Sequence, residues 1–245
     1  MKQSLDLKIL NQPDDTTCGP TCLHAVYQYY GDNIGLDEVV TQVKSFEGGG
    51  TLAVFLACHA LARGYNATIY TYNVQVFDPT WFPMDPLRLK ERLLQQAAAK
   101  QDAKLSEATK GYVNFLDMGG VLRFEDLTPS LLRKYLKRGT PVLTGLSSTY
   151  LYRSMREYGV ACDDDDIRGV PAGHFVVLSG YNKEDRTISV ADPLKSNPLT
   201  GEHYYLESID TVICSILLGI VTYDSNFLLI TPGKKTGRAA GNQSQ

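Results

Sequence analysis

The segment NQPDDTTCGPTCLHAVYQYYGD places a thiol at the start of a helix, and this arrangement constrains the fold most. Apolar residues recur over residues 23–30 at the spacing of one helical face, and Gly31 can end the helix as a C-terminal glycine. Thr17 is suited to be the N-cap, and Pro20 fits the first turn, where its missing N–H costs nothing. Cys18 is therefore expected at the positive end of the helix dipole, which stabilises a reactive thiolate.

Cysteine is more often a buried packing residue than a nucleophile, so the other thiols and the histidines must be compared with Cys18. The chain has five cysteines, Cys18, Cys22, Cys58, Cys162 and Cys214, and four histidines, His24, His59, His174 and His203. The cysteines are odd in number and scattered, which predicts free thiols. Neither set shows zinc-like spacing, so we expect no metal and no cofactor. Cys22, one helical turn after Cys18, is expected to pack beneath the site, with a Cys18–Cys22 redox pair as the alternative.

Composition indicates a globular protein and excludes several classes of partner. The chain has 245 residues, of which 43% are hydrophobic and 21% charged, enough to bury a substantial core. A net charge of −3 without a dense run of Lys or Arg argues against a nucleic-acid partner. The first residues lack the apolar core of a signal peptide, and no apolar segment approaches the length of a membrane span. We therefore expect a soluble, cytoplasmic protein.

The order of the expected elements predicts an α+β fold, because helices come first and strands follow. After the first helix, helices are expected over residues 36–43, 52–62, 128–136 and 207–217. Strands are expected over residues 66–72, 141–146, 174–180, 187–192 and 226–230. We expect a single domain over residues 1–232 with a helical insertion at about 78–120, followed by a disordered tail over residues 233–245.

Two segments outside these elements carry distinctive residues. Trp81 and Phe82, at the start of the insertion, are expected to anchor it by packing on the body of the protein. Residues 147–173 are expected to be irregular and contain the acidic run Asp163–Asp166. A solvated loop is the favoured interpretation of this run, and selection of a cationic substrate group is the alternative. Its spacing does not match an EF-hand calcium loop.

The sequence GHFVVLSGYNKEDRTISVADP predicts a β-hairpin that joins a histidine to a carboxylate. If the turn is centred on Lys183, His174 and Asp192 face one another directly on an antiparallel pair, with Cβ atoms about 4.5–5.5 Å apart. A one-residue slip would place them on opposite faces of the sheet. His174 is thus the expected general base, and Asp192 the group that orients it.

The remaining histidines fit this role less well. His24 lies six residues along the first helix and points away from Cys18, and His59 is in the middle of a helix. His203 lies near a possible strand edge and is the alternative base. Gln12 completes the set, because its amide and the backbone N–H of Cys18 can stabilise the negative charge that develops on a carbonyl oxygen.

The order Gln, Cys, His, Asp resembles that of papain-like enzymes, and the motifs resemble the bacteriocin-processing cysteine peptidases that cleave after double-glycine leaders. The motifs that carry the resemblance are Gln12, Cys18-Gly19, the GHFVVL run at 173–178 and the ADP run at 191–193. The resemblance covers about residues 8–75 and 125–195 and implies a stand-alone member with a papain-like α+β fold. It implies that Gln12 forms the oxyanion hole, Cys18 is the nucleophile, His174 the base and Asp192 its orienter. The helical insertion has no counterpart in a minimal domain of that family.

These observations favour a hydrolase of the thiol protease kind, a cysteine peptidase or amidase acting on a peptide or amide substrate. Acyl transfer to an amine, on the same scaffold, is a second hypothesis. A catalytically silent peptide-binding module is the third, and the complete set of site residues argues against it.

Overall fold

The computed structural model describes residues 2–46 and 50–233. Apart from Gly233, the tail for which disorder is expected lies outside the described residues. The helices are α1 (Cys18–Tyr29), α2 (Leu36–Gln42), α3 (Ala53–Ala62), α4 (Pro86–Lys100), α5 (Ala103–Asp117), α6 (Pro129–Leu136), α7 (Ser148–Tyr152) and α8 (Ile209–Leu218), with 3-10 turns at Pro79–Trp81 and Gly219–Thr222. Within these residues, no helix has the length and apolar character needed to cross a membrane.

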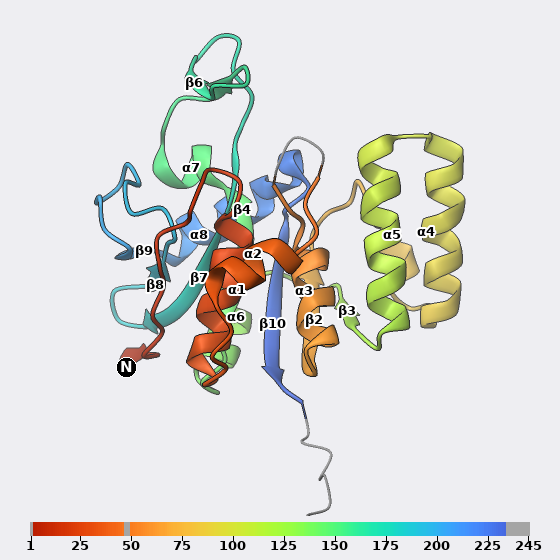
Figure 1. Ribbon diagram of the computed structural model, residues 1–245, viewed down its shortest axis with the longest axis horizontal. Helices are drawn as coiled ribbons and strands as arrows, with labels where there is room; N and C mark the ends of the chain where they lie inside the picture. The colour runs from red at the N-terminus through yellow and green to blue at the C-terminus, as the bar shows by residue number, and fades with distance from the viewer. Residues whose placement is uncertain (1, 47–49, 234–245) are drawn as a thin grey trace, which may run out of the picture.

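Most strands belong to one large sheet with the order β3-β2-β10-β4-β7-β8-β9, and β1 pairs with β7. The strands are β1 (Lys2–Ser4), β2 (Tyr65–Thr71), β3 (Val121–Arg123), β4 (Val142–Ser147), β7 (Gly173–Asn182), β8 (Thr187–Ala191), β9 (Tyr204–Ser208) and β10 (Asn226–Pro232). All pairs are antiparallel except β2 with β3. The strands β5 (Glu157–Tyr158) and β6 (Asp163–Asp164) form a separate hairpin that projects beyond one end of the sheet (Figure 1).

Each face of the sheet is covered by its own helices (Figure 1). Along β7, Phe175 and Val177 point to the face covered by α1 and α3, whereas Val176 and Leu178 point to the face covered by α6 and α8. This alternation explains why β7 is apolar throughout, because both of its faces are buried. The central strand therefore contributes to two cores.

The structure confirms most of the expected elements and corrects two of them. The segment expected to be irregular contains α7 and the β5–β6 hairpin, and the helix expected from residue 207 begins at Ile209. Residues 204–208 form a strand before it, because Tyr205 packs in the core and Ser208 caps the helix by accepting from the Asp210 N–H. The expected insertion contains the α4–α5 hairpin.

The two aromatic residues at the start of this insertion pack as expected. Trp81 and Phe82 are partly buried against the core beneath α1 and α3. The Phe82 ring lies 5.7 Å from the Phe77 ring and 4.8 Å from the Phe124 ring, measured between centroids. The Phe77 ring in turn lies 4.7 Å from the Tyr112 ring of α5, so these contacts join the start of the insertion to α5.

The start of α1 packs unusually closely on β7, and this contact requires glycine at position 19. A Cβ atom at Gly19 would lie 2.6 Å from the Thr51 Cγ2 and 3.3 Å from the Phe175 ring. One turn further, the buried Cys22 thiol donates to the Phe175 carbonyl oxygen at 3.2 Å. Gly19 therefore sets how near the helix start approaches the strand.

We expect Gly19→Ala to lower the free energy of unfolding by about 1–3 kcal/mol, because the added methyl group overpacks this contact. Thr51→Ser removes the obstructing Cγ2 and keeps the hydroxyl that donates to the Lys44 carbonyl at 2.7 Å. Combining the two substitutions should recover most of the loss. Urea unfolding of both single variants and of the double variant measures this, and additive losses would contradict the proposed clash.

Candidate active site

Cys18 is the first residue of α1, as the sequence predicts. Thr17 takes the N-cap position, but the expected side-chain cap is absent. Its hydroxyl donates instead to the Asp14 carbonyl at 3.0 Å and accepts from the Asp14 N–H at 3.2 Å, which closes the preceding turn. Among the described residues, no acceptor contacts the N–H groups of Cys18 and Gly19. The helix start therefore presents uncapped donors beside the thiol.

His174 and Asp192 are in direct contact. The Nε2 atom of His174 lies 2.9 Å from Oδ1 of Asp192, which leaves Nδ1 for Cys18. Both side chains are almost completely buried, with exposed fractions of 7% and 0%. A carboxylate acceptor on Nε2 holds the imidazole in one orientation, with the other nitrogen toward the thiol.

The expected direct opposition of His174 and Asp192 is wrong in its register. The turn is centred between Glu184 and Asp185 rather than on Lys183, because Asn182 pairs with Thr187. This displaces the pairing by three positions, and a β-bulge between Leu178 and Gly180 restores one of them. Val177 therefore pairs with Ala191, and Asp192 continues two positions away from His174 along the ladder. A shift of two keeps both residues on one face as diagonal neighbours, within reach of their side chains.

The Asp192 carboxylate accepts four hydrogen bonds. Oδ1 accepts from His174 and from the Leu194 N–H at 2.9 Å. Oδ2 accepts from the hydroxyls of Tyr152 at 2.7 Å and Tyr205 at 2.8 Å. Burial acts to raise the pKa of Asp192, but these hydrogen bonds, led by that of His174, lower the net pKa below its ordinary value. The carboxylate is therefore held in its charged form.

Tyr152 and Tyr205 also belong to the site, although no expectation from the sequence included them. Tyr152 lies in α7, within a segment expected to be irregular, and Tyr205 lies in β9. No local motif marks either residue, because each reaches Asp192 only through the folding of the chain. His203, the alternative base, instead braces the Asp192 backbone: its Nδ1 lies 2.7 Å from the Asp192 carbonyl, and its own carbonyl accepts the Asp192 N–H at 2.8 Å.

Burial lowers the pKa of His174, but the contact with Cys18 and the hydrogen bond with Asp192 outweigh it and raise the net pKa to about 10. The protonated imidazole is thus favoured in the folded protein. Since the ordinary value is 6.5, this group contributes stability that is fully present below pH 6.5. The contribution is lost as the pH rises toward 10.

Gln12 lies in the loop before α1 and is fixed from two sides. Its N–H donates to the Pro193 carbonyl at 3.0 Å, directly after Asp192 in the chain. Its side-chain Nε2 donates to the Asp14 carbonyl at 2.8 Å, and the residue is only 7% exposed. The Nε2 group retains a second N–H, and the buried Oε1 has no partner among the described residues. The loop thus ties Gln12 to the turn before Cys18 and to the segment that carries Asp192.

Three of the other cysteines, Cys22, Cys58 and Cys162, have environments that favour the neutral thiol. Burial raises the pKa of Cys22 well above its ordinary value, and nearby Cys18 and Asp192 add to this. Burial also raises the pKa of Cys58 and of Cys162. Cys22 packs beneath the site, as expected, and its thiol donates a hydrogen bond to the Phe175 carbonyl.

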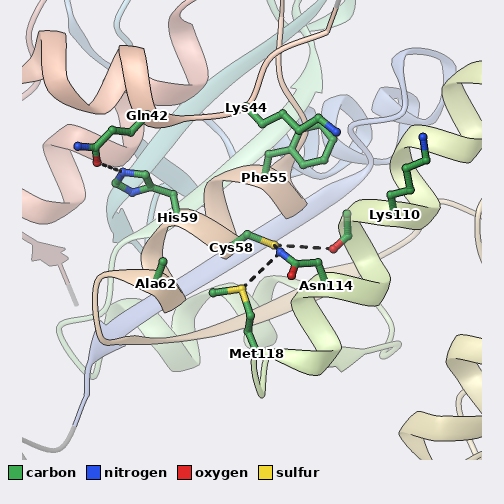
Figure 2. Close-up of a pocket in the computed structure, with 10 residues that line it drawn as sticks. Gln42, Lys44, Phe55, Cys58, His59, Ala62, Lys110, Asn114 and Met118 are labelled. Carbon is green, nitrogen blue, oxygen red and sulfur yellow. Dashed lines mark hydrogen bonds between the residues drawn. The ribbon is translucent and has the colours of Figure 1, made fainter.

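A cavity of about 570 Å³ lies between α3 and α5, and its lining does not include Cys18, His174 or Asp192 (Figure 2). The polar groups on its wall already have partners. His59 contacts the Tyr27 hydroxyl at 2.8 Å and Gln42 Oε1 at 3.0 Å, while Asn114 donates to Cys58 at 3.5 Å. Both ring nitrogens of His59 are therefore engaged by other side chains. Across the described chain, no group of three or more His, Cys, Asp or Glu side chains is placed to hold a metal ion.

We expect His174 to titrate at about pH 10 in the wild-type protein and at a lower pH in Cys18→Ala, which removes a group that raises its pKa. Titration of the histidine ring signals by NMR measures this. His59, whose pKa is lowered mainly by burial, serves as the internal reference and should not move. An unchanged His174 titration in Cys18→Ala would show that the thiol and the imidazole are not coupled.

Comparisons with known proteins show what this chain is similar to. A crystal structure described as a C39-like peptidase from Bacillus anthracis aligns with a TM-score of 0.52 and 14% identity, over 96% of this chain and 100% of that chain. A double glycine motif protease from an AMS/PCAT transporter, in complex with the leader peptide, aligns at 0.45 and 14%, over 94% of each chain. The peptidase domain of Streptococcus ComA, a bifunctional ABC transporter involved in quorum sensing, aligns at 0.43 and 14%, over 92% of this chain and 98% of that chain. No curated protein matches.

The fold is therefore the α+β, papain-like fold of C39 peptidase domains. The family model of the Peptidase_C39 like family matches residues 4–209, a range that includes every site residue described above. The chain belongs to the Peptidase_C39 like family and is a cysteine peptidase-like hydrolase.

Proposed function

We propose that this protein hydrolyses a peptide or amide bond with Cys18 as nucleophile and His174 as general acid and base. The observation that carries the proposal is the linked series of a thiol at a helix start, an imidazole in contact with it, and a buried carboxylate on the far ring nitrogen. This is the arrangement that activates a thiol and holds its base.

The reaction proceeds in two steps. The Cys18 sulfur forms a bond to the carbonyl carbon, and the electron pair of the carbonyl moves to oxygen. When that oxyanion collapses, the C–N bond breaks, and protonated His174 gives its proton to the departing amine. His174 then takes a proton from water, whose oxygen attacks the thioester and releases the acid and the free thiol.

Asp192 orients His174 in this scheme, and Gln12 stabilises the oxyanion. Two features support the role of Gln12: its Nε2 is fixed on the Asp14 carbonyl with one N–H remaining, and the nearby Cys18 N–H has no acceptor among the described residues. A side-chain amide and a backbone amide together form the kind of donor pair that binds an oxyanion.

The proposal extends to the organisation and location of the enzyme. We place the peptidase unit over residues 1–232, with the α4–α5 hairpin as an insertion in it. A reducing compartment such as the cytoplasm is the proposed site of action. The cysteines of the chain are unpaired, and two of them, Cys162 and Cys214, are exposed, which suits a reducing environment.

We expect Cys18→Ala to abolish the release of amine from susceptible peptide amides, because Cys18 is the one thiol among the described residues that contacts His174. Gln12→Ala should retain activity and lower kcat by about 10²–10³, the usual cost of losing one oxyanion donor. Cys214→Ala, at an exposed cysteine, is the control and should act as the wild type does.

Amine release by a panel of short peptide amides measures these rates, and product mass distinguishes hydrolysis from transfer to an added amine. Full activity in Cys18→Ala would overturn the assignment of the nucleophile. A Gln12→Ala variant with unchanged kcat would overturn only the role of Gln12.

A further inference from the structure

Asp224 is a buried carboxyl group that the proposed mechanism does not use. It lies between the 3-10 turn Gly219–Thr222 and β10, and it is 7% exposed. Its Oδ1 atom has no hydrogen-bond partner among the described residues. A buried carboxyl oxygen without a hydrogen-bond partner is unfavourable, which points to a partner supplied by a bound molecule.

The side chain of Asp224 extends toward the end of the sheet that carries His174. A Cβ atom at Gly145 would lie 2.6 Å from the Asp224 Cβ, and one at Gly173 would lie 3.3 Å from Asp224 Oδ2. Because Gly145 pairs with Phe175, and Gly173 lies two residues nearer the strand end, the carboxyl group points along β7 toward the catalytic residues.

Asp224 and Cys18 lie on the same side of β7. The Phe175 ring separates them: a Cβ atom at Gly19 would lie 3.3 Å from one edge of the ring, and one at Gly145 would lie 3.0 Å from another edge. The Phe175 ring therefore lies against both the backbone beside the nucleophile and the strand position on which Asp224 packs.

The backbone at this point is held in an unfavourable conformation. Tyr223 has a φ of 72°, in the left-handed region that non-glycine residues rarely adopt, and it directly precedes Asp224. Lys104 of α5 covers the Tyr223 ring at 4.7 Å and donates to the Thr222 carbonyl at 3.4 Å. The described residues include no ion pair between Lys104 and Asp224, so the nearest ammonium group is engaged elsewhere.

We propose that Asp224 forms a substrate subsite beside Cys18 that takes a cationic side chain, lysine or arginine, close to the scissile bond. The inference rests on the proposed function, since it describes the substrate of that same site. Nothing in the family match assigns it, because Asp224 lies beyond residues 4–209.

The charge and chemistry of the carboxyl group suit this role. Burial raises the pKa of Asp224 to about 8, and Lys104 opposes the rise. Arrival of an ammonium or guanidinium group would draw the carboxyl into its charged form and provide the partner that Oδ1 lacks. A further negative charge lies near Cys18 in the chain. Asp15, three residues before it, is close enough to the β5–β6 hairpin to raise the pKa of Cys162.

The test uses peptides that carry lysine, norleucine or glutamate at each of two positions on either side of the cleaved bond. Norleucine matches the length of lysine without its charge. We expect the wild type to prefer lysine over norleucine at one position by about 10- to 100-fold in kcat/KM, the usual range for a charge-assisted hydrogen bond. Asp224→Asn should bring this ratio close to 1 while norleucine peptides are still cleaved.

The pH dependence of the ratio separates charge recognition from a structural role. In the wild type, the lysine preference should grow from pH 6 to about pH 9, as the Asp224 carboxyl ionises, and it should stay flat in Asp224→Asn. The other titratable groups near Asp224, Lys104 and Tyr112 of α5, remain in both proteins. Asp210→Asn, at an exposed carboxylate paired with Arg186, is the control and should keep the wild-type ratio.

Equal ratios in wild type and Asp224→Asn at every position would overturn the subsite and leave the proposed function intact. If no peptide of the set is cleaved in a way that depends on Cys18, the proposed function fails, and the subsite fails with it.

Discussion

The burial of the Asp192 carboxylate is the constraint on which the site depends. A charged group with no solvent exposure is tolerated only when its oxygens are bonded, and here four donors converge on it. They come from β7 (His174), α7 (Tyr152), β9 (Tyr205) and the loop after β8 (Leu194). These elements are thus tied to a single carboxylate, and His174, the proposed general base, is fixed by the same contacts.

Cys18, the proposed nucleophile, belongs to the other layer of the molecule. Cys18 opens α1, which packs on the opposite face of β7 from α6 and α8 (Figure 1). The proposed catalytic pair, Cys18 and His174, therefore forms where two layers meet at the end of one strand. Gly19 sets the distance between α1 and β7, because only a residue without a side chain allows the helix start to approach Phe175 and Thr51 so closely. In this fold, the contacts that pack the core at Gly19 also position the thiol of Cys18.

The hairpin shows how a sequence-based prediction can be right about a pair and wrong about its register. Strand parity decides whether His174 and Asp192 share a face, and parity survives an error of two positions but not of three. The turn alone would have displaced the pairing by three, which would place the two side chains on opposite faces. The bulge between Leu178 and Gly180 restores the parity. A bulge of this kind leaves no reliable mark in a single sequence, because it depends on pairing with neighbouring strands.

The chemical groups and their local setting can be read from the sequence: a thiol at a helix start, an apolar strand that begins with a histidine, and an aspartate that ends the next strand. These follow from periodicity and turn chemistry, which act over a few residues. The donors around Asp192, the hold of Pro193 on Gln12 and the place of the Asp224 carboxyl group depend instead on the folded chain. Those contacts join segments far apart in the chain, and they are set by how the two layers pack on the sheet.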